Sequence, residues 1–137
     1  PVRLRLDADA APTAARSFVH LVRTGALKGL GFHRVVPGFV AQGGDPRGDG
    51  SGGPGYTLRC ENNPHRHRTG TVGMALSGRD TGGSQFFVTL TPQPHLDGRY
   101  TVFGEVVEGM EAVRALVEGD RILDAELSGE SRDVLSQ

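Results

Sequence analysis

Two short segments carry side chains whose types and spacing could do chemistry. The first, residues 32–44, reads Phe-His-Arg-Val-Val-Pro-Gly-Phe-Val-Ala-Gln-Gly-Gly, two β-prone runs around a Pro-Gly that favours a hairpin. A two-residue loop would pair Arg34 with Ala41, whereas a three-residue loop pairs Arg34 with Gln42. We predict the three-residue loop, because it places a guanidinium and a carboxamide on one sheet face with Phe39 beside them.

The second segment, residues 83–90, repeats this chemistry in the sequence Gly-Ser-Gln-Phe-Phe-Val-Thr-Leu. Side chains alternate along a strand, so Gln85 and Phe87 share one face while Phe86 and Val88 share the other. An isolated arginine is usually solvated, but two neighbouring strands that each offer a carboxamide beside an aromatic ring indicate a binding face.

Composition excludes several classes of function. The 137 residues suit one domain, and 15 basic against 16 acidic residues give no electrostatic case for nucleic acid or a membrane surface. A single cysteine, Cys60, excludes an internal disulfide. No apolar run reaches about 18 residues and no leader-like start is present, so we expect a cytoplasmic protein.

Glycine and proline separate many short β-prone runs. Helical spacing of apolar residues occurs only twice, between Pro12 and Gly25 and between Met110 and Gly119. We therefore predict a mainly β fold, a closed eight-stranded antiparallel β-barrel capped by two α-helices. The barrel domain would span 1–127, and 128–137 would be a polar, frayed C-terminal tail. Outside the two segments above, strands are expected at 2–6, 56–59, 71–76, 100–107 and 123–127.

Two other motifs suggest different chemistry. Cys60, His65 and His67 resemble metal ligands, but they are only three and arginines interrupt them, so we expect no metal. Asp80-Thr81-Gly82 resembles the catalytic triplet of aspartic proteases, which makes a protease an alternative. Arg79 beside Asp80 would favour the charged carboxylate, whereas protease chemistry needs a shared proton.

The remaining candidates can hold a peptide but cannot easily break a covalent bond. They are one guanidinium, two carboxamides and the apolar side chains Phe39, Val40, Met74, Phe87 and Leu96. Rotation about an X-Pro bond breaks no bond and faces a barrier of about 18–20 kcal/mol. A cation held near the prolyl nitrogen would bind the twisted amide better than either planar form, so no cofactor is needed.

The chain resembles the cyclophilins, a barrel family of peptidyl-prolyl cis–trans isomerases. The resemblance covers nearly the whole length and lies in long motifs in family order: Phe-His-Arg-Val-Val-Pro-Gly-Phe at 32–39, Gln-Gly-Gly-Asp at 42–45, Gly-Ser-Gln-Phe-Phe at 83–87, Leu-Asp-Gly-Arg at 96–99 and Val-Phe-Gly at 102–104. It implies isomerisation of X-Pro bonds in proline-containing peptides and unfolded proteins, by a monomer without a cofactor.

The resemblance also implies roles for single residues. Arg34 would be the catalytic guanidinium. The substrate-binding residues would be Phe39, Val40, Gln42, Met74, Ala75, Leu76, Gln85, Phe87, His95, Leu96 and Tyr100. Phe39, Phe87 and Leu96 would form the proline pocket, with Val40 and Met74 at its wall.

Several positions depart from the common family pattern. Val40 stands where Met is frequent and implies a shallower wall, and Leu76 and Gly82 stand where Asn is frequent. His95 stands where Trp is common and implies weak cyclosporin binding, and Tyr100 replaces a frequent His. These substitutions keep open a second hypothesis, a proline-peptide binding module with little or no turnover.

Overall fold

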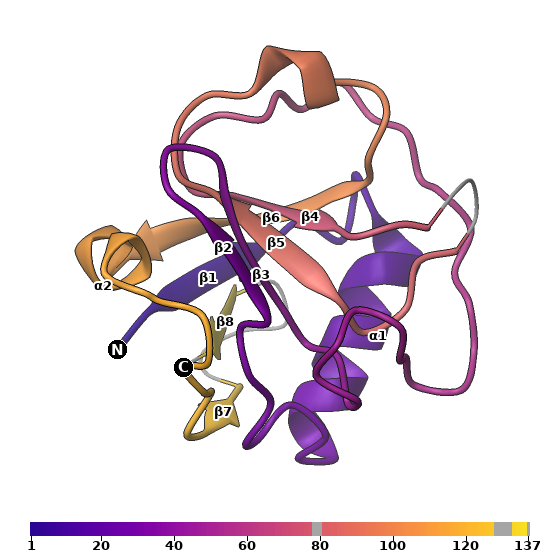
Figure 1. The fold of residues 1–137 in the computed structure, drawn as a ribbon. Helices are drawn as coiled ribbons and strands as arrows, with labels where there is room; N and C mark the ends of the chain where they lie inside the picture. The colour runs from indigo at the N-terminus through magenta and orange to yellow at the C-terminus, as the bar shows by residue number, and fades with distance from the viewer. Residues whose placement is uncertain (78–80, 128–132, 137) are drawn as a thin grey trace.

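The computed structural model describes residues 1–77, 81–127 and 133–136, the last four as backbone alone. Within these ranges the chain forms eight strands, two α-helices and one 3-10 helix (Figure 1). The strands are β1 (Arg3–Leu6), β2 (Arg34–Val36), β3 (Val40–Gly43), β4 (Thr71–Met74), β5 (Phe86–Thr89), β6 (Val102–Glu108), β7 (Ala125–Glu126) and β8 (Asp133–Ser136). The helices are α1 (Pro12–Arg23), η1 (Pro94–Leu96) and α2 (Met110–Arg114).

The strands form one antiparallel sheet in the order β2-β3-β5-β4-β6-β1-β8-β7. The predicted mainly β fold with two helices is confirmed. Within the described residues, no strand pair joins β2 to β7. The backbone just before each of these strands is nevertheless linked, by a bridge between Gly31 and Arg121 and by the Phe32 N–H, which donates to the Asp120 carbonyl at 2.8 Å.

Helix α1 packs one face into the core beneath the sheet (Figure 1). Pro12 begins the helix, where its missing N–H has no cost, and Gly25 follows its end with a φ of 75°. The ring of Phe18 lies 5.6 Å from that of Phe86 and 5.4 Å from that of Phe103. Of the apolar stripe predicted at Ala15, Phe18, Val19 and Val22, all but Val19 are buried, and Val19 is partly buried against the core. The buried helix residues are Ala14, Ala15, Phe18, Leu21 and Val22.

Helix α2 is shorter than the sequence predicts. It ends at Arg114 instead of continuing to Gly119, and the side chain of Val117 is 62% exposed. The N–H of Val117 donates to the carboxylate of Asp120 at 2.9 Å, a local bond that replaces a helical one. In the part of the chain that the structure describes, neither α-helix has the length and apolar character needed to cross a membrane.

Two segments differ from their predicted structure. The expected strand at 56–59 forms only an isolated bridge between Leu58 and Gly82. Conversely, β8 lies within the segment assigned to a frayed tail, and its backbone pairs with β1 and β7. Strand pairing uses backbone groups that every residue has, so a polar sequence gives little warning of it. The other predicted strands occur with ends that differ by a few residues.

Candidate functional site

The hairpin that carries Arg34 has the predicted three-residue loop. Arg34 pairs with Gln42, and Val36 pairs with Val40. The N–H of Phe39 donates to the Val36 carbonyl at 3.0 Å, and the loop glycine has a φ of 72° that glycine adopts without strain. Arg34, Gln42 and Val40 therefore face the same side of the sheet.

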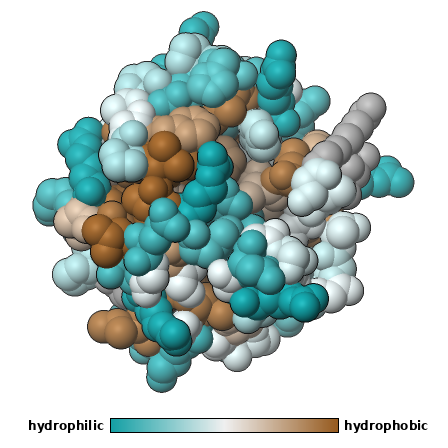
Figure 2. Space-filling model, in the orientation of Figure 1, coloured by the Kyte–Doolittle hydropathy of each residue, from teal (hydrophilic) through white to brown (hydrophobic). Residues whose placement is uncertain are grey.

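A cavity of about 120 Å³ lies on that face. Val40, Phe87 and Leu96 are buried around it and form an apolar cluster separate from the main core. Figure 2 shows apolar side chains at the surface over the β2–β3 hairpin, with hydrophilic ones beside them. The residues that line the cavity are Arg34, Phe39, Val40, Gln42, Ala75, Leu76, Phe87, Leu96 and Tyr100.

Arg34 lies at the rim of this cavity. Its guanidinium carbon is 5.7 Å from the centre of the Phe39 ring, within range of a cation–π contact. The same ring stacks on His95, with centroids 5.9 Å apart. None of the ion pairs found among the described residues involves Arg34. The guanidinium can therefore donate to a ligand in the cavity.

The hairpin tip and η1 lie at the same end of the molecule, at the top of Figure 1. The segment that leads into η1 holds the tip. The hydroxyl of Thr91 donates to the Gly38 carbonyl at 2.6 Å, and the N–H of Leu90 donates to the Phe39 carbonyl at 2.8 Å. These bonds fix Phe39 on one side of the cavity relative to Leu96 on the other.

Of the two predicted carboxamides, only that of Gln42 lines the cavity. Gln42 lines the cavity and donates from Nε2 to the Oε1 of Gln85 at 3.2 Å. Gln85 does not line the cavity, and its Nε2 donates to the carbonyls of Gly50 and Gly52 at 3.0 and 2.8 Å. Gln85 therefore acts on the cavity through Gln42.

Met74 lies outside the cavity, contrary to the sequence expectation. It is 4% exposed and packs in the main core. Met74 pairs with Phe86, whereas Gly73 pairs with Phe87, so alternation turns Met74 away from the cavity. Gly73 is the residue that sequence reasoning missed, since a Cβ there would lie 2.4 Å from the Phe87 ring. No local pattern marked it, because the pairing of Gly73 with Phe87 joins two separate strands.

The remaining predicted residues occupy the rim. Ala75 and Leu76 line the cavity just beyond the end of β4, and the N–H of Ala75 donates to the Gln85 carbonyl at 3.1 Å. Tyr100 meets Phe87 edge to face, with ring centroids 5.7 Å apart. Like Gln85 and Met74, His95 does not line the cavity. It contacts the site through its stacking on Phe39.

Two carboxyl groups that follow site segments in the sequence, Asp45 after β3 and Asp97 after Leu96, have lowered pKa values. Burial alone would raise the pKa of Asp45, but the backbone N–H groups of Arg47, Gly50 and their neighbours outweigh it. The pKa of Asp97, which follows Leu96, is lowered first by the backbone N–H of His67 and then by its side chain. Both carboxylates are therefore charged at neutral pH.

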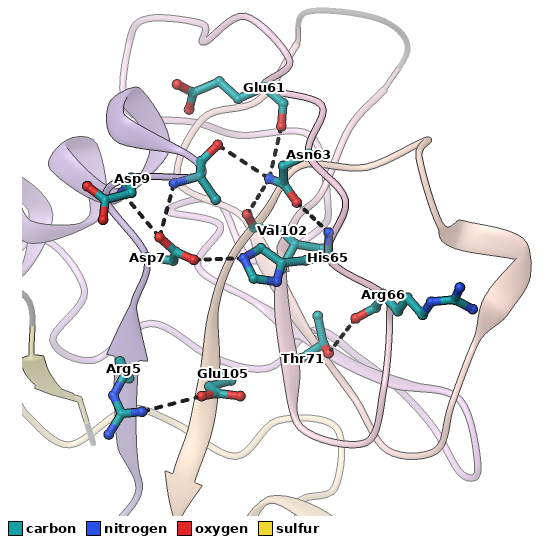
Figure 3. A network of polar contacts seen from close by, with 11 residues as sticks. Arg5, Asp7, Asp9, Glu61, Asn63, His65, Arg66, Thr71, Val102 and Glu105 are labelled. Atoms are coloured by element: carbon teal, nitrogen blue, oxygen red, sulfur yellow. Dashed lines mark hydrogen bonds and ion pairs between the residues drawn. The ribbon is translucent and has the colours of Figure 1, made fainter.

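The other candidate motifs do not converge on the cavity. His65 pairs with Asp7 at 2.7 Å in the polar network of Figure 3, whereas His67 pairs with Asp97 at 2.9 Å. Among the described residues, no three side chains of His, Cys, Asp or Glu are placed to share a metal ion. Asp80, the residue on which the protease alternative depends, lies outside the described residues.

Known proteins are similar to this chain in sequence and in fold. The family described as cyclophilin type peptidyl-prolyl cis-trans isomerase/CLD matches residues 1–131. Peptidyl-prolyl cis-trans isomerase B of Bacillus subtilis is 48% identical, in an alignment that covers 93% of this chain and 91% of the relative. A peptidyl-prolyl cis-trans isomerase of Synechococcus elongatus is 50% identical, in an alignment that covers 92% of this chain and 88% of the relative. A crystal structure of a cyclophilin type isomerase of Cryptosporidium parvum, determined in the presence of the dipeptide Ala-Pro, has a TM-score of 0.83 at 29% identity and covers 99% of this chain and 92% of its own.

Proposed function

This chain belongs to the family of cyclophilin-type peptidyl-prolyl cis–trans isomerases, and we propose that it accelerates X-Pro rotation with Arg34 as its catalytic residue. One observation carries the proposal. Arg34 stands opposite Gln42 at the rim of a cavity of about 120 Å³ whose buried walls are the apolar side chains of Val40, Phe87 and Leu96. A cavity of this size suits one small apolar ring, and the charge is at its edge.

The chemistry follows from the electronic structure of the imide bond. Resonance makes the X-Pro bond planar and opposes its rotation by about 18–20 kcal/mol. At the twisted transition state that resonance is lost, and the prolyl nitrogen regains a lone pair that can accept a hydrogen bond. An N–H of Arg34 would donate to this nitrogen while Phe39 and Phe87 hold the pyrrolidine ring. This bond forms only in the twisted state, so it lowers the barrier.

The peptide around the proline would be held by polar groups at the rim. Gln42 carries a carboxamide into the cavity, and Ala75 and Leu76 line its edge just after β4. We propose that these residues bind the backbone of proline-containing peptides and unfolded chains. The presence of Ala-Pro with the Cryptosporidium parvum relative supports a substrate of this class. Because an imidazole at His95 offers less apolar surface than an indole, we expect weak cyclosporin binding.

We also infer that the eight-stranded sheet closes into a barrel, and that this single domain includes β8 (Asp133–Ser136) together with the predicted residues 1–127. The bridge between Gly31 and Arg121, the residues just upstream of the two edge strands, supports closure. A closed barrel would hold β2 and β3 rigidly, and a rigid strand pair keeps Arg34 within reach of the pocket.

Exchange NMR on an Ala-Pro peptide tests the proposed function. We expect Arg34→Ala to lower kcat/KM by roughly a hundredfold to a thousandfold, because a preorganised donor to the transition state is lost. Arg16→Ala, at an exposed position of α1, serves as the control and should retain full activity. An Arg34→Ala enzyme with full activity would disprove the role of Arg34. Peptide binding by the wild type without faster exchange would instead identify a binding module.

A further inference from the structure

A buried histidine behind the cavity holds both ends of the segment that carries Leu96. His67 is 2% exposed, and its Nδ1 lies 2.9 Å from Oδ1 of Asp97. Its backbone N–H donates to the same oxygen at 2.6 Å, and its carbonyl accepts from the N–H of Gln93 at 2.7 Å. Residues 93 and 97 flank η1, so His67 clamps η1 from both sides.

The ring of His67 also touches two residues of the cavity. It stacks on Phe87, with centroids 5.8 Å apart and an angle of 17° between the planes. It meets Tyr100 edge to face, with centroids 6.5 Å apart. Phe87 and Tyr100 line the cavity and His67 does not, so His67 forms a layer directly behind them.

The polar atoms of the ring indicate what the histidine contributes. Asp97 is charged and can only accept, so Nδ1 carries the hydrogen that joins them. The other ring nitrogen, Nε2, is buried and has no hydrogen-bond partner among the described residues, which is unfavourable. A phenyl ring would fill the same space without an unpaired nitrogen. The imidazole therefore adds what a phenyl ring lacks, a donor that reaches Asp97.

We propose that His67 is a positioning residue of the isomerase site, one that holds the side chain of Leu96 in place relative to the ring of Phe87. This proposal rests on the proposed function, because only that function assigns the pocket to the proline ring of a substrate. His67 touches no substrate. It keeps the pocket formed before the peptide arrives, so that binding does not have to order the segment around η1.

Two substitutions separate the two contributions of His67. His67→Phe keeps the ring and removes the donor. His67→Asn removes the ring and keeps a donor, because its amide nitrogen can take the place of Nδ1. We expect His67→Phe to raise KM for an Ala-Pro peptide by about fivefold with little change in kcat, because the pocket binds ground and transition states alike.

The order of effects distinguishes positioning from simple packing. His67→Asn leaves a void beside Phe87 and should be the less stable variant, yet its KM should stay closer to wild type than that of His67→Phe. A purely structural role would make KM follow stability. The methyl chemical shifts of Leu96 should change in His67→Phe, because the Leu96 side chain moves relative to the Phe87 ring.

The second His–Asp pair supplies the control. His65 lies two residues earlier and pairs with Asp7 at 2.7 Å, but it is exposed within the network of Figure 3 and lines no part of the pocket. His65→Phe should leave KM, kcat and the Leu96 signals unchanged. If His67→Phe does not fold, Asp97→Ala removes the acceptor from a position that is 27% exposed and should raise KM similarly.

The outcomes separate this proposal from the one it rests on. A wild type that does not accelerate exchange overturns the proposed function. An active wild type with wild-type KM and Leu96 signals in folded His67→Phe, or in Asp97→Ala, overturns the role of His67 alone. A fall in kcat at constant KM also overturns it, because His67 would then act on the transition state.

Discussion

Gln42 and Gln85 are joined side chain to side chain, the Nε2 of the first donating to the Oε1 of the second at 3.2 Å. Gln85 is itself held by the carbonyls of Gly50 and Gly52. The loop between β3 and β4 thus orients a residue that lines the cavity, although the loop glycines themselves do not line it. This relay makes the orientation of Gln42 dependent on a segment outside the site.

Removing the relay should weaken substrate binding through Gln42. We expect Gln85→Leu to lower kcat/KM by about tenfold, because Gln42 loses its fixed orientation and two carbonyls lose a donor. Exchange NMR on the Ala-Pro peptide measures the loss. In a Gln42→Leu background the same substitution should cost much less. Additive losses in the double variant would show that Gln85 acts independently of Gln42.

Gly73 should be intolerant of a side chain because of Phe87. A Cβ at this position would lie 2.4 Å from the Phe87 ring, so Gly73→Ala must push the ring into the cavity. We expect a fall in kcat/KM of at least about tenfold and a loss of roughly 1–3 kcal/mol in the free energy of unfolding. Gly53→Ala is the matched control, since no atom lies within 4 Å of its added Cβ. Normal activity in Gly73→Ala would contradict the close contact.

Glu61 should stabilise the fold without affecting catalysis. Its carboxylate accepts from the N–H groups of Thr13 and Ala14 at 2.9 and 2.8 Å, at the positive end of the α1 dipole. Figure 3 shows Asn63 beside it, donating to the Glu61 carbonyl. Glu61→Ala should lower the free energy of unfolding by about 1 kcal/mol in urea titrations. Because Glu61 does not line the cavity, kcat/KM should stay unchanged, and a large loss of activity would argue against this separation.

Asp45 should make the free energy of unfolding depend on pH in the acidic range. Burial opposes its ionisation, yet backbone N–H groups of the following loop lower its pKa below the ordinary 3.8. A carboxyl with a lower pKa in the folded state contributes stability above its unfolded pKa and loses it as pH falls through the folded value. Between about pH 5 and about pH 3, the free energy of unfolding should therefore fall more steeply for wild type than for Asp45→Asn. The free energy of unfolding is measured by urea titration at each pH. The same dependence on pH in wild type and Asp45→Asn would exclude a contribution from Asp45.

Much of the site could be predicted from local patterns. The Pro-Gly turn limited the hairpin to two registers, and the chemistry of the shared face favoured the one that pairs Arg34 with Gln42, which the structure has. Alternation along the strand predicted that Phe86 and Phe87 face opposite sides, and the structure places Phe86 in the main core and Phe87 at the cavity. Met74 lies opposite Phe86 and therefore faces the core, a placement that depends on the pairing of two separate strands.

By itself the sequence determined the mainly β class, the hairpin register and the face on which Arg34 lies, because turns and strand periodicity act over a few residues. Only the tertiary structure decided that Gln85 orients Gln42, that Gly73 yields space to Phe87 and that His67 stacks behind it. Each of these contacts joins separate segments of the chain. Such contacts depend on how whole strands and loops are placed, and no local pattern of residues encodes that placement.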